Sequence, residues 1–225
     1  MKRKTYSLSG EHGDIESSLN FFLQFNIPKD AKILEIGCRY GSLIYNLHSL
    51  GYEKAEGIDI DSESIRCGKR KYKKIEKKLN LCKERPDFRP KSFDVVLIFD
   101  VLEHLQNPKE YLSELVKALK EGGIIIFQTP NKLTNVPWEV LHHKSLFAYK
   151  KYHRSLMTYW KLKSIIVGLS PEEYRIKKVS LDSEYNRKKL EKKFGRCSRL
   201  LIKLFDLMPI YFHPHFWGWV RGKGL

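Results

Sequence analysis

The chain has 225 residues, of which 42% are hydrophobic and 30% are charged, and these values fit one globular domain with a full core. It lacks the run of about 18 apolar residues that a transmembrane helix needs, and its basic N-terminus lacks the apolar stretch of a signal peptide. The four cysteines are scattered without a Cys-x-x-Cys pair, which disfavours a zinc site or a disulfide framework and predicts a cytoplasmic protein.

The charge balance is strongly basic. Lys and Arg number 42 against 26 Asp and Glu, for a net charge of +16. Such a surface attracts anionic partners, either RNA or an acidic membrane. A lysine-rich proteome gives the same balance without such a partner, so the composition leaves both interpretations open.

Apolar periodicity and capping residues predict alternating helices and strands over the first 131 residues. A helix over residues 14–26 begins at the N-cap Asp14, and a strand over 31–36 follows it. The later elements are a helix from Leu43 that ends at Gly51, a strand that closes at Asp59, a helix that begins at Asp61, a buried strand over 93–99, a helix from Asn107-Pro108 to Gly122-Gly123, and a strand over 124–127.

The C-terminal part is less regular. Residues 132–157 form an insertion that is rich in aromatic residues and histidine, and Thr158 caps the helix that follows. A strand over 174–181, a basic helical stretch over 187–207 and a last strand over 216–220, antiparallel at the edge of the sheet, complete the chain. We therefore predict a single domain over residues 1–225, with a core over 14–131 and a C-terminal part over 158–225.

One stretch of the core is typical of nucleotide binding. The apolar run that begins at Ile33 ends in Glu35 and breaks into a turn with two glycines, Gly37 and Gly41, before a helical pattern. The glycines let the backbone approach a ligand that a Cβ atom would repel. A second acid, Asp59, ends the next apolar run, where a carboxylate can accept both hydroxyls of a ribose.

Two further segments, over residues 92–105 and 119–131, complete the pattern. With the first two motifs they make the chain resemble the class I S-adenosylmethionine-dependent methyltransferases, in particular the branch with the ubiquinone-biosynthesis O-methyltransferases. The resemblance implies an α/β fold: a Rossmann-like, seven-stranded, mostly parallel sheet with helices on both faces and an antiparallel last strand. It also implies methyl transfer from S-adenosylmethionine, with a small or lipid-linked acceptor as the expected substrate.

The same resemblance implies a cofactor site. Glu35 would hold the cationic amino group, the glycine turn would line the methionine and the ribose, and Asp59 would bind the ribose hydroxyls. The expected cofactor-binding residues are Glu35, Gly37, Cys38, Gly41, Asp59, Ile60 and Asp100.

The chain departs from the family pattern at two places. Arg39 stands where relatives have glycine, which concerns the shape of the loop. Leu81 and Cys82 stand where relatives have a Gly-Asp pair, so the acid that would accept the hydrogen bond of the adenine amino group is missing. Glu84 or Asp87 would have to substitute, or both are solvated loop charges.

Two histidines are the expected catalytic residues. Methyl transfer to oxygen requires alignment of the nucleophile and removal of its proton, and histidine suits the second task. His104 follows a strand end, where active sites of such sheets lie, and His153 precedes the Thr158-capped helix at a spacing common among relatives. A structural role for either histidine is the alternative.

A second branch offers a different function. Small-RNA terminal 2′-O-methyltransferases carry a similar set, here Asp100, Glu103, His104 and His153, that holds a divalent metal. We expect no metal and keep the metal-dependent RNA methyltransferase as an alternative. A degenerate methyltransferase fold that serves as a binding module is a further alternative.

The basic stretch near the C-terminus has two interpretations. Seven cations lie over residues 187–199, and apolar residues over 205–217 follow them. The pattern suits peripheral docking on an anionic membrane. A helix that packs on the sheet with solvated lysines explains it as well.

Overall fold

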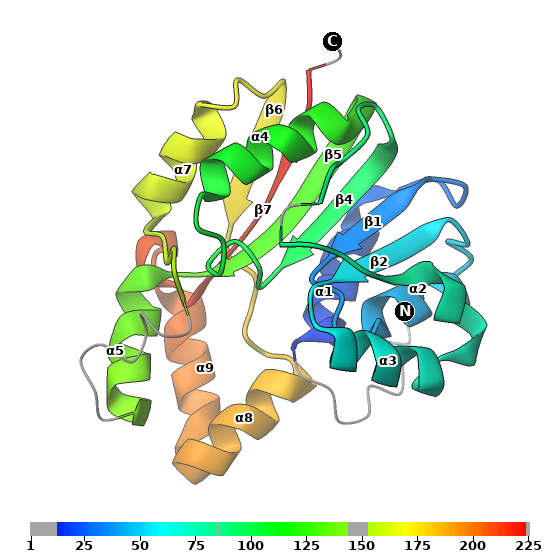
Figure 1. The fold of residues 1–225 in the computed structure, drawn as a ribbon. Helices are drawn as coiled ribbons and strands as arrows, with labels where there is room; N and C mark the ends of the chain where they lie inside the picture. The colour runs from blue at the N-terminus through cyan, green and yellow to red at the C-terminus, as the bar shows by residue number, and fades with distance from the viewer. Residues whose placement is uncertain (1–12, 85, 144–152, 224–225) are drawn as a thin grey trace.

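The computed structural model describes residues 13–84, 86–143 and 153–223. Its elements follow the order that the sequence predicts, except that the expected insertion over 132–157 begins with a helix that is not predicted (Figure 1). The N-terminal elements are α1 (Ile15–Phe22), η1 (Leu23–Phe25), β1 (Ile33–Ile36), α2 (Ser42–Ser49), β2 (Ala55–Asp59), α3 (Ser62–Lys71), η2 (Lys73–Lys78), β3 (Leu79–Leu81), β4 (Phe93–Phe99) and α4 (Pro108–Ala118). The C-terminal elements are β5 (Leu119–Pro130), α5 (Lys132–His143), α7 (Tyr159–Val167), β6 (Glu173–Lys177), α8 (Glu184–Phe194), η3 (Gly195–Cys197), α9 (Ser198–Leu207), η4 (Ile210–Phe212) and β7 (His215–Arg221).

The strands form a seven-stranded sheet in the order β3-β2-β1-β4-β5-β7-β6. The pairs from β3 to β5 are parallel, and β7 is antiparallel to both of its neighbours, β5 and β6. The predicted Rossmann-like sheet with an antiparallel last strand is therefore confirmed. One detail is wrong: β7 lies inside the sheet, because the short strand β6 covers it and forms the edge.

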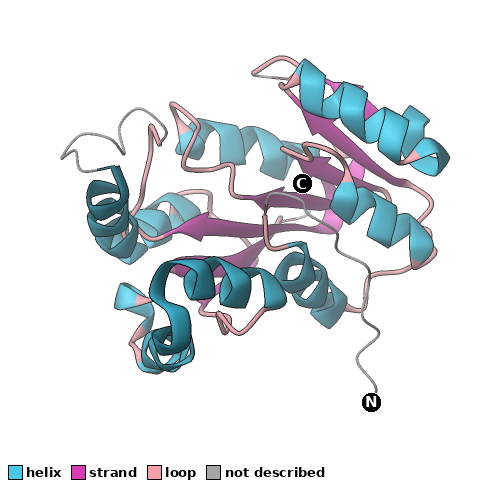
Figure 2. Ribbon diagram, turned by 90° about the horizontal axis from the view of Figure 1, so that it is seen from below, coloured by secondary structure: helices cyan, strands magenta, loops and turns pink. Residues whose placement is uncertain are grey.

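Helices cover both faces of the sheet (Figure 2). Side chains alternate between the faces, so Ile33 and Val95 join the core under α1 and α2, whereas Leu34 and Val96 join the core under α4 and α7. Strand β4 is buried on both faces, as its nearly continuous apolar run predicts. Among the described residues, no helix is both long and apolar enough to cross a membrane.

The predicted N-caps are confirmed. The side chains of Asp14, Asp61, Asn107 and Thr158 each accept a hydrogen bond from a backbone N–H in the first turn of the helix that follows. They set the points at which α1, α3, α4 and α7 begin.

Several predicted boundaries are wrong. Helix α4 ends at Ala118, and Gly122-Gly123 lies within β5, where the pairing with β4 shifts its register. The positive φ of Gly122 therefore serves an irregular strand rather than a helix end. The expected strand 174–181 stops at Lys177, and the helical stretch 187–207 divides into α8 and α9 at Gly195, whose φ is also positive.

Candidate active site

A cavity of about 680 Å³ opens at the carboxyl ends of β1, β2 and β4, within the range of ligand pockets. Six of the seven predicted cofactor residues line it, and Gly41 does not. The six are Glu35, Gly37, Cys38, Asp59, Ile60 and Asp100. Both predicted catalytic histidines, His104 and His153, also line the cavity.

The glycines of the turn are required for a different reason than the sequence suggests. Gly37 and Gly41 have φ angles of +75° and +77°, which L side chains rarely adopt. A Cβ atom at Gly37 would collide with the side chain of Val101, and one at Gly41 with that of Leu79. The expectation that the glycines make room for a ligand is thus incomplete, because neighbouring protein side chains already occupy that space.

Asp59 organises the floor of the cavity and is only 7% exposed. Its Oδ2 accepts a hydrogen bond of 2.7 Å from the backbone N–H of Arg39, and its Oδ1 accepts one of 2.8 Å from that of Asp61. A carboxylate has about four acceptor positions, so each oxygen retains capacity for a hydroxyl. Arg39 takes a positive φ of 47° and contributes its backbone here, which explains how the loop accommodates a residue other than glycine.

Glu35 is a buried acid that forms no ion pair with the described residues. Its Oε2 is buried and has no hydrogen-bond partner among the described residues. Burial, and next the negative charge of Asp59, raise the pKa of Glu35 from 4.5 to about 8. Burial likewise raises the pKa of the Cys38 thiol, so this cysteine is not a thiolate nucleophile. The orphaned carboxyl oxygen marks a place where a bound positive group would be stabilised.

Of the two acids that could replace the missing adenine acid, the structure places Glu84 at the cavity but not Asp87. The cavity wall at this point consists of Cys82, Lys83 and Glu84. The backbone N–H of Cys82 donates a hydrogen bond of 2.9 Å to the carbonyl oxygen of Asp59. Glu84 forms an ion pair of 3.0 Å with Arg154, and Asp87 does not line the cavity.

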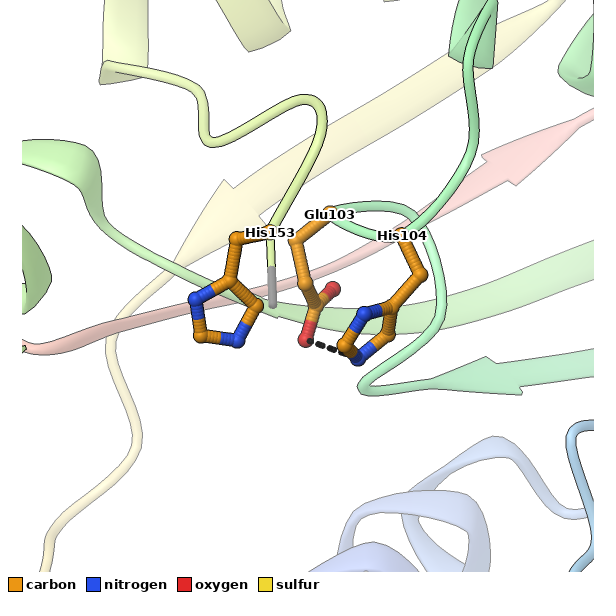
Figure 3. A group of neighbouring side chains, drawn as sticks. All are labelled: Glu103, His104 and His153. Carbon is orange, nitrogen blue, oxygen red and sulfur yellow. Dashed lines mark ion pairs between the residues drawn. The ribbon is translucent and has the colours of Figure 1, made fainter. Parts of the chain in front are cut away.

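Glu103, His104 and His153 form a cluster on one side of the cavity (Figure 3). The imidazole rings lie 5.1 Å apart, and one ligand atom from each of the three residues lies within 4.8 Å of the others. Ser155 joins the two loops, because its backbone N–H donates 2.8 Å to the carbonyl oxygen of Glu103. Asp100 lines the same cavity but is not part of the cluster.

Burial controls the charge of this cluster. Burial, and next the negative charge of Asp100, raise the pKa of Glu103 well above its ordinary value. The hydroxyl of Thr129 donates a hydrogen bond of 3.0 Å to Oε2 of Glu103, which opposes this shift. Burial, and next His104, lower the pKa of His153, so its neutral form predominates at pH 7. Asp100 lines the cavity. Desolvation by the surrounding protein raises the pKa of its carboxyl group as well.

The C-terminal elements add cavity residues that the sequence does not single out. The Oε1 atom of Gln128, on β5, accepts a hydrogen bond of 3.1 Å from the backbone N–H of Asp100. The Nε2 atom of Gln128 lies 2.8 Å from Nδ1 of His215. Desolvation by the surrounding protein lowers the pKa of His215 to about 4, so this histidine is neutral at pH 7. Lys189 of α8 supplies a cation to the cavity wall. Gln128 lies in the segment over 119–131 that completes the family pattern, whereas none of the motifs contains His215 or Lys189.

Asp14 has a second role besides its cap. Its Oδ2 atom accepts a hydrogen bond of 2.7 Å from the hydroxyl of Ser183 and one of 2.8 Å from Nδ2 of Asn186. These bonds attach the start of α8 to the start of α1, and both segments line the cavity. Helix α8 is thereby held at the wall of the cavity.

The comparisons with known proteins agree with this geometry. The methyltransferase domain family matches residues 9–167. A ubiquinone biosynthesis O-methyltransferase of Idiomarina loihiensis is 31% identical over 105 residues, which are 45% of this chain and 43% of that protein. One of Pelagibacter ubique is 33% identical over 106 residues, 46% of this chain and 44% of that protein. The chain therefore spans less than half the length of these curated relatives.

Solved structures show the same fold at low identity. The phosphoethanolamine N-methyltransferase 2 of Haemonchus contortus, in complex with phosphomonomethylethanolamine and S-adenosylhomocysteine, has a TM-score of 0.66 at 18% identity, over 93% of this chain and 53% of that one. The YcgJ protein of Bacillus subtilis has a TM-score of 0.64 at 12% identity, over 93% of this chain and 100% of that one.

The sheet order, the glycine turn and the acids at the ends of β1 and β2 define an α/β protein with a nucleotide-type ligand site. The family match covers well over half of the chain, and the chain belongs to the methyltransferase domain family.

Proposed function

We propose that the chain transfers the methyl group of S-adenosylmethionine to an oxygen atom of a small or lipid-linked acceptor. The observation that carries the proposal is that one cavity is lined both by the acids Glu35 and Asp59 and by the cluster of Glu103, His104 and His153. The similarity of about 30% to ubiquinone biosynthesis O-methyltransferases favours oxygen as the nucleophile.

Glu35 and Asp59 fit the cofactor. The orphaned Oε2 of Glu35 suits the cationic amino group of a methionine moiety, and the two oriented oxygens of Asp59 suit a ribose diol. The cofactor supplies a methyl group on a sulfonium, which is an excellent leaving group. The protein then has to align the acceptor oxygen in line with the methyl group and take up the proton of the acceptor.

His153 is the proposed general base and His104 its neighbour at the acceptor. His153 is predominantly neutral at pH 7, so it can accept a proton. Glu103 lies 3.9 Å from Nε2 of His104. Gln128 and His215 complete a polar wall in which an acceptor hydroxyl finds partners.

The variant His153→Ala tests the base. We expect kcat to fall by about 100- to 10,000-fold, the usual contribution of a general base, with unchanged affinity for S-adenosylhomocysteine. Turnover is measured on an acceptor found by screening quinone precursors, glycan lipids and RNA, and affinity by calorimetry. The control is His48→Ala, a histidine of α2 outside the cavity that contacts the carbonyl oxygen of Ala55. Full turnover by His153→Ala would contradict the assignment.

A metal-dependent function is the second candidate, and the cluster geometry favours it. Glu103, His104 and His153 bring a carboxylate and two imidazoles close enough to share one ion, a chemically sensible set for a divalent transition metal such as Mn²⁺. Under this alternative the acceptor is an RNA ribose hydroxyl, and affinity for RNA falls steeply with salt because bound counterions are released.

Chelation separates the two candidates. We expect activity to persist in a chelator, because a simple base needs no ion. Loss of activity on RNA 3′ ends, with recovery on addition of Mn²⁺, would favour the metal. Calorimetric titration with Mn²⁺ of the parent and of Glu103→Gln gives a readout independent of activity. Cofactor binding without turnover on any acceptor would favour the binding module.

A further inference from the structure

Helix α9 presents an apolar face to solvent. Leu200, Leu204 and Leu207 are 70%, 50% and 82% exposed, and their spacing of four and three residues places them on one face. The buried residues of the helix, Ser198 and Ile202, lie on the opposite face, toward α8. A surface helix normally turns its apolar stripe inward, so the outward stripe of α9 indicates a binding surface.

Exposed aromatic residues lie in η4, the next element after α9, and on α7. Phe212 and Tyr211 of η4 follow α9 directly in the chain and are 51% and 37% exposed. Trp160 of α7, 56% exposed, stacks on Tyr211 with ring centroids 5.0 Å apart. Tryptophan and tyrosine combine an apolar ring with a polar tip and are enriched where protein meets the membrane–water interface.

The charges that point outward from α9 are positive. Arg199 and Lys203 are exposed, and Lys203 is one turn from Leu200 and from Leu207. The helix contains one acid, Asp206, which is directed inward: it accepts from the backbone N–H of Leu181 at 2.9 Å and lies 3.7 Å from His213. Cations beside an outward apolar stripe complement an anionic lipid surface.

We propose that the outer face of α9, with Trp160, Tyr211 and Phe212, docks on an anionic membrane surface. In the docked state the leucines enter the interface between headgroups and acyl chains, while Arg199 and Lys203 extend to lipid phosphates. A second copy of the chain fits this face less well, because a two-fold contact would bring the same cations together.

The helix that carries the docking face packs with its other face on a helix that lines the cavity. Helix α8, which packs on α9, contributes Tyr185 and Lys189 to the cavity wall. Helices α5, α8 and α9 project together beyond the carboxyl edge of the sheet (Figure 1). A docked molecule would therefore meet a lipid-linked acceptor beside its active site, a consequence that rests on the proposed methyl transfer.

Vesicle co-sedimentation of the full chain tests the docking. We expect the parent to bind vesicles of phosphatidylcholine and phosphatidylglycerol, and Leu200→Gln/Leu207→Gln to bind at least about tenfold more weakly, because burial of leucine side chains provides much of the affinity. The matched control is Leu23→Gln/Leu81→Gln, which replaces two apolar residues, 38% and 57% exposed, outside α7, α9 and η4. Both double variants should keep the melting temperature of the parent, since the replaced side chains are exposed.

A charge pair of variants tests the role of anionic lipid. Arg199→Gln/Lys203→Gln should weaken binding by about 30-fold at low salt, since each cation near an anionic surface contributes about fivefold. Lys74→Gln/Lys77→Gln, which removes two exposed cations of η2, should have little effect. Moderate salt should weaken the binding of the parent more than that of the Arg199→Gln/Lys203→Gln variant.

Three outcomes would overturn the docking proposal. The first is that the parent does not bind vesicles at low or at moderate salt concentration. The second is that Leu200→Gln/Leu207→Gln binds vesicles as tightly as the parent does. The third is that sedimentation shows a parent dimer that does not bind vesicles and that the leucine substitutions dissociate. Calorimetry with S-adenosylhomocysteine on the same variants keeps the two proposals apart. Unchanged cofactor affinity with lost vesicle binding supports docking, and absence of cofactor binding in the parent would count against methyl transfer alone.

Discussion

We expect Asp59→Ala to weaken the binding of S-adenosylhomocysteine by about 2–3 kcal/mol, or roughly 30- to 160-fold in Kd. The loss is large because hydrogen bonds to a charged group are the stronger kind, and two hydroxyls lose their acceptor together. The variant also leaves the backbone N–H groups of Arg39 and Asp61 without the acceptor that holds them at 2.7 and 2.8 Å. The loop that carries Arg39 therefore loses its support at the same time.

The matched control for this variant is Asp94→Ala. Asp94 also accepts a hydrogen bond from a backbone N–H, that of Lys32 at 2.7 Å, but it lies at the start of β4, at the opposite edge of the sheet from the cavity. We expect Asp94→Ala to lower the melting temperature without a change in Kd. Equal calorimetric affinities of Asp59→Ala and the parent would contradict the assignment of the ribose site.

The core of the fold could be predicted because its signals are local. The positions of Asp14, Asp61, Asn107 and Thr158 reveal helix starts, since a cap acts within three residues of its helix. The strand–turn–helix around Gly37 and the acid at Asp59 predict one cavity, because parallel strands bring their carboxyl ends to one edge. The double glycine at Gly122 misleads, because positive φ serves a strand irregularity as well as a helix end.

Apart from His104 and His153, the acceptor side could not be predicted, because it depends on contacts between distant segments. Asp14 and Asn186 are 172 residues apart in the chain, and Gln128 and His215 are 87 apart, yet each pair is in direct contact. The side of α9 that faces solvent could not be predicted either. Its leucine pattern predicts an amphipathic helix, but which side is buried depends on where α8 lies, and the sequence of α9 alone does not contain this.

Glu35→Gln should separate stability from cofactor binding. In the ligand-free protein, burial and Asp59 raise the pKa of Glu35 from 4.5 to about 8, so the folded state holds its proton more tightly than the unfolded state does. The resulting stability is fully present below the unfolded pKa and is lost as the pH rises through the folded pKa. A shift of this size corresponds to at most about 5 kcal/mol. Glutamine cannot ionise, so the variant escapes this loss.

We therefore expect the difference in unfolding free energy, parent minus Glu35→Gln, to decrease between about pH 5 and about pH 9. Any packing cost of the glutamine is the same at both pH values and cancels in this comparison. Urea unfolding of the ligand-free proteins measures it. A difference that is independent of pH would show that the buried carboxyl does not titrate as its surroundings imply.

Cofactor affinity should respond in the opposite sense. A cationic amino group favours the ionised form of Glu35, so the affinity of the parent for S-adenosylmethionine should rise with pH below the pKa, by up to about tenfold per pH unit. Glu35→Gln should bind more weakly and lose this dependence, whereas Glu56→Gln, on β2 outside the cavity, should keep it. Calorimetry in buffers of different ionisation enthalpy should detect release of a proton from the parent and none from Glu35→Gln. Proton release by both proteins would assign the titration to another group, and the acid at the end of β1 would then be structural.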